Sequence, residues 1–372
     1  MSENERKVSV HLAGGDYDIL VKPGLHLDIG AWLKGKTKSG KVAVISDSNV
    51  FPLFGEAIVK SLSDAGLHAI VALLPAGEDH KTLTDLLPVY DAVLAGKIER
   101  STPVLALGGG VVGDMAGFVA ATVLRGVPLV QAPTTLLAMV DASVGGKTGV
   151  NHSTGKNLIG SFHQPIGVLI DPLALKTLPA RELRGGLAEC IKHDIIRDYE
   201  GFCRLESHIE KALALDIDYL AELVAHNVAI KARVVEADPL ERGERAHLNF
   251  GHTFGHAIET VSRHEYSHGE CVALGMTAAA FLAKQLGMID DEQRRRMVNL
   301  IAKAGLPTNN LNLDTKAVVE AMAFDKKVAA GKVRFVLPTK IGAVVVRDDV
   351  AREKVTEAVE SLQGAGLGSR RG

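Results

Sequence analysis

The sequence is poor in aromatic residues and in cysteine. Phe, Trp and Tyr make up 4% of its 372 residues, and there is a single tryptophan. A stacking surface for single-stranded nucleic acid needs several aromatic side chains, so the composition argues against that function. The three cysteines, Cys190, Cys203 and Cys271, form no Cys-x-x-Cys pair and leave an odd count. This usage is typical of reduced thiols, and we therefore expect a cytoplasmic protein.

An excess of charge and a long apolar run are also missing. The formal net charge is −2, which gives no electrostatic reason to expect nucleic acid or an anionic membrane as a partner. The first ten residues, MSENERKVSV, lack the apolar region of a signal peptide. The longest apolar runs, such as residues 272–283, are shorter than the roughly 20 residues that span a bilayer. We expect neither nucleic acid nor a membrane as a partner.

The first half of the chain has the pattern of an α/β fold. Runs rich in β-branched residues and bounded by turn residues indicate buried strands at residues 41–49, 69–75, 103–110, 128–135 and 167–172. Helical patterns lie between them, at residues 54–66 and 83–96. Strands that alternate with helices predict a parallel sheet covered on both faces.

The second half is mainly helical. Long helical periodicities occupy residues 217–237, 269–287 and 291–305, and a strand pair is expected at residues 332–339 and 342–350. The chain is longer than one hydrophobic core usually serves. The change of pattern near residues 175–183 predicts an α/β domain over residues 1–178 and a mainly helical domain over residues 179–372. We expect the glycine-rich tail, residues 363–372, to be disordered.

A glycine loop follows the third expected strand. Gly108, Gly110 and Gly113 satisfy Gly-x-Gly-x-x-Gly, in the strand–turn–helix context where backbone amides approach a pyrophosphate. Tight strand-to-helix turns also use glycine for steric reasons, so the pattern alone is weak evidence. No acidic residue follows about 20 residues later, where the Rossmann order needs one for the ribose. Asp47, at the end of an earlier strand, could serve instead, which favours a nucleotide site of a different lineage.

A second glycine-rich segment, residues 144–149, comes close to a P-loop. The motif fails because Asp141 stands where its first glycine is required. Asp141 and Lys147 then have two interpretations: a turn with an exposed lysine, or a charged pair beside an anionic ligand. GKNLIG, residues 155–160, adds Lys156 and Asn157 in a further glycine-punctuated loop. Three such segments close together favour a ligand site.

Histidines gather in the second half, with five of the 14 between residues 247 and 268. His252 and His256 are four residues apart in a helical stretch, so both project from one face, and the spacing pairs them as metal ligands. Packed or surface histidines are the alternative. The spacing does not choose a third ligand among His264, His268, Glu189, Glu259, Glu265 and Glu270. A zincin peptidase is unsupported, because Thr253 occupies the place of its general base.

The chain resembles the 3-dehydroquinate synthase family of sugar-phosphate cyclases. The segments that carry the resemblance occur in the family's order and are PAGEDHKT, LGGGVVGD, RGVPLVQAPTTLLAMVDASVGGKTGVNHSTGKNLIG, TLPARELRGGLAECIKH, NFGHTFGHAIE, HGE and FDKKV. The implied fold is an N-terminal Rossmann-like nucleotide-binding domain with its own topology, followed by a mainly helical metal-binding domain.

The resemblance also implies a reaction. The family converts 3-deoxy-D-arabino-heptulosonate 7-phosphate to 3-dehydroquinate and phosphate, in the shikimate pathway. A tightly held NAD⁺ oxidises the substrate, phosphate is eliminated, the hydride returns, and an aldol step closes the ring. The net reaction is therefore not a redox one.

The resemblance implies a metal site that differs from the helical pair. Zinc or cobalt would be held by Glu189, His252 and His268, in the cleft between the domains, and would polarise substrate oxygens. His256 would face the substrate as a hydrogen-bonding or proton-shuttling group.

Further site residues follow from the resemblance. The substrate carries a carboxylate and a phosphate, which demand fixed cations and polar partners. Residues implied to contact it, besides His256, are Asp141, Lys147, Asn157, Lys192, Lys231, Arg245, Asn249 and Lys327 or its neighbour Lys326. Arg125 would reach the partner subunit's site, which implies a homodimer. NAD⁺ would lie along Asp47, Gly77, Glu78, Asp79, His80, Lys81, Gly110, Val111, Val112, Gly113, Asp114, Thr134, Thr135, Lys147, Lys156, Ala174, Leu175, Lys176 and Thr177.

Two other enzyme classes remain as alternatives. A sibling cyclase would make a cyclitol, but Arg245 and Asn249 follow the pattern for a carboxylate-bearing substrate. A metal-dependent polyol dehydrogenase would release NADH.

Overall fold

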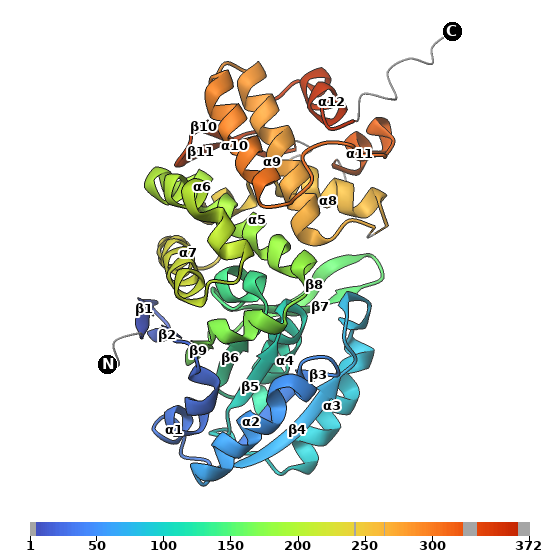
Figure 1. The fold of residues 1–372 in the computed structure, drawn as a ribbon. Helices are drawn as coiled ribbons and strands as arrows, with labels where there is room; N and C mark the ends of the chain where they lie inside the picture. The colour runs from blue at the N-terminus through green and yellow to red at the C-terminus, as the bar shows by residue number, and fades with distance from the viewer. Residues whose placement is uncertain (1–4, 242, 264, 323–332, 364–372) are drawn as a thin grey trace. The chain divides into compact units, whose positions relative to one another are not determined.

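The chain folds into two compact units (Figure 1). The computed structural model describes residues 5–241, 243–263, 265–322 and 333–363. The first unit contains residues 1–179 and 217–240, and the second contains residues 180–216 and 241–372. No helix in these described ranges is both long and apolar enough to cross a membrane.

A seven-stranded sheet forms the centre of the first unit, in the order β1-β2-β9-β6-β5-β3-β4. Its strands are β1 (Arg6–Val10), β2 (Tyr17–Val21), β3 (Lys41–Asp47), β4 (His68–Leu74), β5 (Val104–Gly108), β6 (Leu129–Pro133) and β9 (Gly167–Ile170). All neighbours pair in parallel except β1 and β2, which form an antiparallel pair. The five strands expected from the β-branched runs are β3, β4, β5, β6 and β9, so the parallel α/β sheet is confirmed.

Helices cover both faces of this sheet (Figure 1). They include α1 (Ile29–Lys34), α2 (Phe51–Asp64), α3 (Leu83–Ala95) and α4 (Gly110–Thr122). Ala43 and Ile45 of β3 pack with residues of α3 and α4, whereas Val42 and Val44 pack with residues of α1 and α2. Because both faces are buried, the strand reads as a continuous apolar run instead of an alternating one.

A two-stranded hairpin corrects the loop interpretation of residues 155–160. The strands are β7 (Lys147–His152) and β8 (Gly155–Phe162), preceded by a short π-helix, η4 (Ala138–Ala142). Gly149 and Gly160 lie opposite one another in the ladder. A Cβ on Gly160 would come within 2.1 Å of the Thr148 carbonyl oxygen. The close backbone contact requires glycine, and glycine hides the sequence signature of a strand.

Helix α7 (Ile217–Ala237) belongs to the first unit, although the expected boundary placed it in the second domain. It packs against β1, β2, η4 and the 3₁₀ helix η5 (Pro172–Thr177). An amphipathic pattern shows that a helix has a buried face, but not which core receives that face. The chain first passes from one unit to the other after Pro179.

The second unit is built mainly from helices. They are α5 (Ala180–Arg197), α6 (Tyr199–Leu213), η6 (Glu244–Asn249), α8 (His252–Val261), α9 (His268–Gln285), α10 (Asp291–Lys303), α11 (Thr315–Met322) and α12 (Arg352–Glu360). Helix α9 is buried along most of its length and packs against α5, α8, α10 and α12, as expected of a helix that is apolar on all sides.

The strand pair expected near the end of the chain is confirmed as β10 (Phe335–Lys340) and β11 (Ala343–Arg347). Lys326 and Lys327 lie outside the described residues, as do His264 and all but the first residue of the tail expected to be disordered.

Candidate active site

The carboxyl ends of β3 and β5 bring two predicted nucleotide-binding elements together. These strands are neighbours, but the chain leaves β3 for β4 on one side and β5 for β6 on the other. Ligands of open parallel sheets bind where the strand order reverses in this way. Asp47 ends β3, and its carboxylate Oδ1 accepts hydrogen bonds from the amides of Asn49 and Val50, both at 2.8 Å. Helix α4 begins at Gly110 beside it and directs its first free amides towards the same edge.

The three glycines of the Gly-x-Gly-x-x-Gly motif differ in how much space a side chain would find there. A Cβ on Gly108 would lie 2.6 Å from the Val112 side chain, and one on Gly113 would lie 3.0 Å from Gln131 Oε1. A Cβ on Gly110 would only meet Ala142 and Leu137 at 3.4 and 3.8 Å, which is ordinary van der Waals contact. Packing therefore explains glycine at the first position, whereas a side chain at the third would require the Gln131 side chain to shift. Packing does not require glycine at Gly110, where α4 starts.

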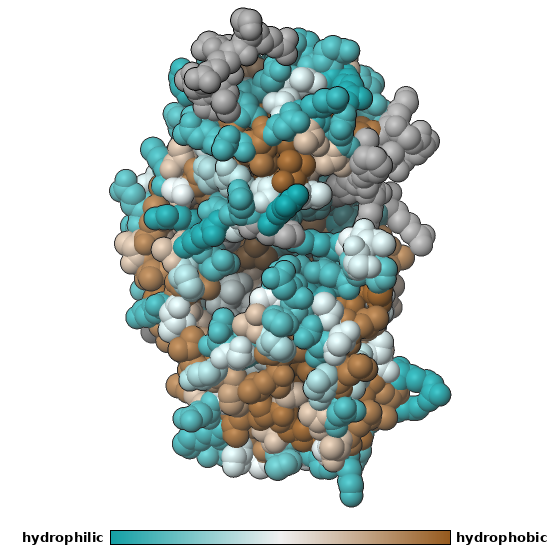
Figure 2. Space-filling model, turned by 90° about the vertical axis from the view of Figure 1, so that its right-hand side faces the viewer, coloured by the Kyte–Doolittle hydropathy of each residue, from teal (hydrophilic) through white to brown (hydrophobic). Residues whose placement is uncertain are grey.

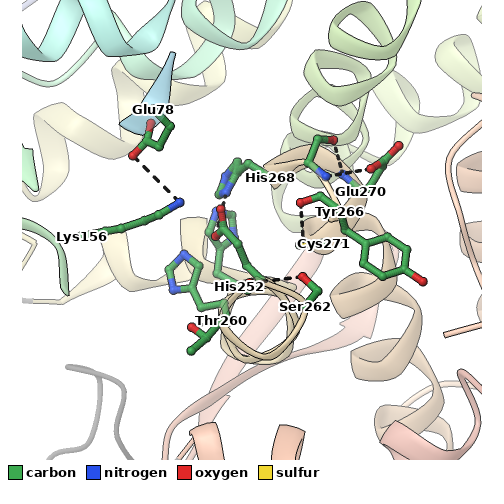
Figure 3. A network of polar contacts seen from close by, with 12 residues as sticks. Glu78, Lys156, His252, Thr260, Ser262, Tyr266, His268, Glu270 and Cys271 are labelled. Atoms are coloured by element: carbon green, nitrogen blue, oxygen red, sulfur yellow. Dashed lines mark hydrogen bonds and ion pairs between the residues drawn. The ribbon is translucent and has the colours of Figure 1, made fainter. Parts of the chain in front are cut away.

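Lys81 connects three of the segments predicted to bind the cofactor and substrate. Its ammonium is buried and donates to Asp114 Oδ2 and to Asn157 Oδ1, both at 2.6 Å. Burial raises the pKa of Asp114, and the Lys81 charge opposes this shift. The Lys156 ammonium lies 3.9 Å from Glu78 Oε1 (Figure 3). The turn at residues 77–81 is thus tied to both α4 and the β7–β8 hairpin.

The charged pair expected at Asp141 is formed with Lys231 of α7. The Lys231 ammonium lies 2.7 Å from Asp141 Oδ1 and also donates to the Asp141 carbonyl oxygen. Lys147 is exposed at the start of β7. Both members of the pair belong to the first unit.

The remaining predicted cofactor residues of this unit lie in short connecting segments. The Thr134 amide donates to the Gly108 carbonyl at 2.9 Å, which holds the segment after β6 against the end of β5. Thr135 Oγ1 accepts from the Ala138 amide at 3.1 Å. Thr177 Oγ1 donates to the Ala174 carbonyl at 3.0 Å within η5.

The second unit gathers a metal-binding set from three helices. Glu189 lies on α5, while His252 and His268 are the first residues of α8 and α9. Glu189 Oε1 lies 3.8 Å from His252 Nε2 and 3.7 Å from His268 Nε2, and Figure 3 shows both labelled imidazoles close together. One ligand atom from each residue falls within 4.8 Å of the others. Two imidazoles and a carboxylate are a donor set that catalytic zinc takes, so these residues could hold a divalent ion.

The Nδ1 atoms of His252 and His268, which do not face Glu189, each have a partner that orients the imidazole ring. His252 Nδ1 lies 3.1 Å from the Phe250 carbonyl, which can only accept, so Nδ1 carries the proton and Nε2 is left to bind a ligand. His268 Nδ1 lies 3.7 Å from Glu259 Oε2. Burial lowers the pKa of His268, but the carboxylates of Glu189 and Glu259 outweigh burial and raise it to about 9. The local field therefore favours positive charge.

The His256 imidazole lies close enough to Glu259 and His268 to be a metal ligand itself. Its ring centroid is 5.4 Å from that of His252 and 6.2 Å from that of His268. His256, Glu259 and His268 also satisfy the distance criterion for a metal site. The helical spacing thus located the right neighbourhood, and geometry alone leaves two overlapping ligand sets.

Glycines bring the three helix backbones into contact, which explains how the ligand atoms come so close. Gly251 has φ 78° and starts α8 in the left-handed region, immediately before His252. A Cβ on Gly275 of α9 would lie 1.9 Å from the Gly251 carbonyl oxygen, and one on Gly269 would lie 2.3 Å from Gly185 Cα on α5. Helices that touch through their backbones place short side chains within reach of one ion.

This unit also contains two buried cations, one of which contacts the metal-binding set, and a partly buried amide. Lys192 is 1% exposed and its ammonium contacts the Glu189 carboxylate, and Arg245 is 2% exposed in η6. The Asn249 amide donates to Glu241 Oε1 at 3.2 Å. The sequence reasoning assigned no role to Glu241 and could not choose Glu259. Glu259 lies one helical turn after His256, so the spacing marks it as a candidate but does not prefer it to the other nearby carboxylates. Glu241 precedes Asn249 in a different segment, and no helical spacing relates the two.

Known proteins are similar in sequence to this chain over nearly its whole length. Residues 71–185 match the family model for the N-terminal part of 3-dehydroquinate synthase, and residues 186–328 match the model for its C-terminal part. A 3-dehydroquinate synthase from Crocosphaera subtropica is 45% identical over 96% of this chain and 99% of its own length. This chain belongs to the 3-dehydroquinate synthase family. A second 3-dehydroquinate synthase, from Picosynechococcus, is 47% identical over 94% of this chain and 97% of its own length.

The fold of this 3-dehydroquinate synthase family member is similar to those of several solved structures. A 2-epi-5-epi-valiolone synthase from Streptomyces hygroscopicus, solved with NAD⁺ and Zn²⁺ bound, is 30% identical with a TM-score of 0.86, over 95% of this chain and 98% of that one. A 2-deoxy-scyllo-inosose synthase has a TM-score of 0.88 at 24% identity, over 96% and 100% of the two chains, and a butanol dehydrogenase from Thermotoga maritima has 0.65 at 17%, over 92% and 95%. The last two show the fold alone.

Proposed function

We propose that this chain converts 3-deoxy-D-arabino-heptulosonate 7-phosphate to 3-dehydroquinate and phosphate, as a carbon–oxygen lyase acting on phosphates. The observation that carries this proposal is identity of 45% and 47% to 3-dehydroquinate synthases along nearly the whole chain. The 2-epi-5-epi-valiolone synthase is less similar, at 30%. The 3-dehydroquinate synthase reaction is therefore favoured over that of a sibling cyclase.

NAD⁺ is assigned to the first unit, at the carboxyl ends of β3 and β5. It would take a hydride from the substrate and return it within one turnover. Asp47 suits the ribose, the first amides of α4 suit the pyrophosphate, and Gly110 leaves room for close approach. The residues proposed to line this site are those named from the resemblance, from Asp47 to Thr177.

The divalent metal, zinc or cobalt, is assigned to Glu189, His252 and His268. When bound, it would supply fixed positive charge that stabilises negative charge on substrate oxygens. Lys192 and Arg245 are buried cations suited to the substrate's anionic groups, and His256 is placed one helical turn from His252 to move a proton. Asp141 and Lys231 orient one another and are proposed to contact substrate hydroxyls.

A single assay tests the reaction type. Enzyme supplied with NAD⁺, Zn²⁺ or Co²⁺ and the heptulosonate phosphate should release phosphate with no lasting rise in NADH absorbance, because the hydride is returned. Removing the metal with a chelator should stop phosphate release, and adding it back should restore the rate. Steady accumulation of NADH would instead support a polyol dehydrogenase, the second enzyme class that shares this fold.

The same assay distinguishes the sibling cyclases. An analogue in which a hydroxymethyl group replaces the substrate carboxylate leaves Arg245 and Asn249 without the group they are proposed to bind. A buried charge that loses its partner costs about 3–5 kcal/mol, so the analogue should react more than about a hundredfold more slowly. Faster turnover of the analogue would contradict the assignment.

We assign the reaction to the cytoplasm. Cys190, Cys203 and Cys271 all lie in the described part of the chain and form no disulfide with one another, and Cys190 and Cys271 are buried. A reducing compartment keeps thiols in this state.

We also propose that the enzyme is a homodimer in which Arg125 serves the partner's site. Leu124 and Arg125 both have left-handed backbone conformations, with φ of 50° and 64°, at a cost of roughly 1–2 kcal/mol per residue. Such strain is concentrated at functional positions. The turn presents the exposed Arg125 side chain outward, directly after α4.

An apolar surface near this turn supports the dimer. Leu83, Leu87 and Leu94 of α3 are exposed, and Figure 2 shows apolar side chains gathered at the lower end of the view, which belongs to the first unit. Tyr90 of α3 is hydrogen-bonded at 2.6 Å to Thr122, the last residue of α4. Exposed apolar patches of this kind mark protein interfaces.

Arg125→Ala should lower kcat/KM about 10- to 100-fold, the range expected for losing a hydrogen-bonded charge contact of about 1.5–3 kcal/mol. The affinity for NAD⁺ should remain unchanged, as measured by titration calorimetry. Mixing Arg125→Ala with Lys231→Ala should recover activity, because each mixed dimer would then contain one intact site. No recovery on mixing, or a monomeric enzyme in solution, would contradict the shared site.

A further inference from the structure

Asn151 occupies an irregular position in the β7–β8 hairpin. The ladder pairs Val150 with Ile159 and then His152 with Gly155, so the register shifts across Asn151. The Asn151 amide leaves the hairpin and donates to the Lys81 carbonyl at 2.8 Å. Bulges of this kind redirect a residue out of its own ladder and are frequent beside active sites.

The Asn151 side chain uses both ends of its amide. Its Nδ2 donates to Glu78 Oε1 at 2.8 Å, and its Oδ1 accepts from the Asn157 amide at 2.9 Å. The chemistry of the two partners fixes this orientation, because a carboxylate can only accept and a backbone amide can only donate. Asn157 has a left-handed φ of 53°, and the Asn151 oxygen holds its amide in that conformation.

These three bonds join two segments that the proposed function assigns to different molecules. Glu78 and Lys81 belong to the turn assigned to NAD⁺, whereas Asn157 is assigned to the substrate. We infer that Asn151 is a positioning residue that locks the turn at residues 77–81 to the β7–β8 hairpin, so that the cofactor and substrate contacts are held at a fixed separation. The identity of the two ligands, NAD⁺ and the substrate, rests on the proposed function. The hydrogen bonds that join the two segments are observed independently of it.

The test replaces Asn151 and measures binding separately from turnover. Asn151→Ala removes both side-chain bonds, and it should weaken NAD⁺ binding about tenfold and lower kcat by a similar factor, since each bond contributes modestly. His152→Ala is the matched control, because the side chain of this exposed neighbour bonds to Thr154 at the hairpin tip and to no other residue in the described part of the chain. Titration calorimetry on the metal-loaded enzyme gives the NAD⁺ affinity, and thermal unfolding shows whether both variants are folded at the temperature of the titration.

A donor–acceptor exchange separates positioning from a general structural effect. Asn151→Asp keeps the acceptor for the Asn157 amide but sets one carboxylate against the Glu78 carboxylate, so it should also weaken NAD⁺ binding about tenfold. Adding Glu78→Gln restores a donor and an acceptor in reversed order. Because Glu78 is itself assigned to the NAD⁺ site, the reference is Glu78→Gln alone: the double variant should bind NAD⁺ as tightly as Glu78→Gln and more tightly than Asn151→Asp. This rescue also keeps the test valid should Asn151→Ala fail to fold.

The outcomes are distinct for the two claims. NAD⁺ affinities of Asn151→Ala and Asn151→Asp equal to that of His152→Ala would overturn the inference, as would a double variant no better than Asn151→Asp. A wild-type enzyme that binds NAD⁺ but releases no phosphate from the heptulosonate phosphate would overturn the proposed function instead. The NAD⁺ affinities of the variants would still decide whether Asn151 positions the turn.

Discussion

His268→Ala should abolish retention of the divalent metal, whereas His256→Ala should leave the metal bound and slow turnover. His268 Nε2 faces Glu189 Oε1 at 3.7 Å, as His252 Nε2 does at 3.8 Å, so all three residues are directed towards one point. Losing a direct ligand should cost more than the ~10–100-fold in metal affinity that loss of an outer partner costs. Metal analysis of the purified, dialysed variants by atomic emission measures the retained stoichiometry.

A further variant, Glu189→Gln, distinguishes the two possible ligand sets. His256, Glu259 and His268 also lie within metal-binding distance of each other, so His268→Ala alone cannot separate the two sets. Glu189→Gln should release the metal if Glu189, His252 and His268 hold it. Metal retained by Glu189→Gln and lost from His256→Ala would reverse the assignment.

Gly275→Ala should destabilise the second unit by about 3 kcal/mol, at the upper end of the usual cost of overpacking. The added methyl would lie 1.9 Å from the Gly251 carbonyl oxygen and 2.8 Å from the Gly255 amide nitrogen. Both neighbours are backbone atoms, so relief requires α8 and α9 to separate. That separation would move His252, which follows Gly251, away from His268, and metal affinity should fall as well.

Gly185→Ala is the matched control, because Gly185 of α5 also lies at a close contact with α9. Its Cβ would find only Gly269 Cα, at 3.8 Å, which is ordinary contact, and alanine is favoured over glycine inside a helix. Thermal unfolding of both variants with the metal removed isolates the packing effect. Gly185→Ala should unfold at or slightly above the wild-type temperature. A Gly275→Ala protein as stable as the wild type would show that the helices separate without cost.

The parallel sheet could be predicted from the sequence because its strands are buried on both faces. The strand β3, which lies between β5 and β4, is a continuous buried run in the structure, and such runs are visible without knowledge of the partner strands. The hairpin β7–β8 could not be predicted in the same way. Its opposed glycines, Gly149 and Gly160, are required by backbone contact and carry no strand signal.

The metal-binding residues show the same limit. Helical spacing identified His252 and His256 because a repeat of four residues is a local signal. Glu189 arrives from a different helix, and only α-helix packing through glycines brings its carboxylate to His252. No spacing rule encodes that contact, so Glu189 came from the resemblance to a family. The roles of the individual residues remain predictions for the variants described above.

The path of the chain through α7 limits how this enzyme can be divided or recombined. The polypeptide passes between the two units after residues 179, 216 and 240, because α7 returns to the sheet unit before the second unit is complete. A fragment beginning at residue 180 would carry the apolar face of α7, including Leu220, Val224 and Val228, without the strands that bury it. Exchanging halves with a related cyclase at one crossover would also separate Lys231 from its Asp141 partner. A workable chimera needs two exchanged segments, residues 180–216 and 241–372, with α7 kept from the parent of the sheet.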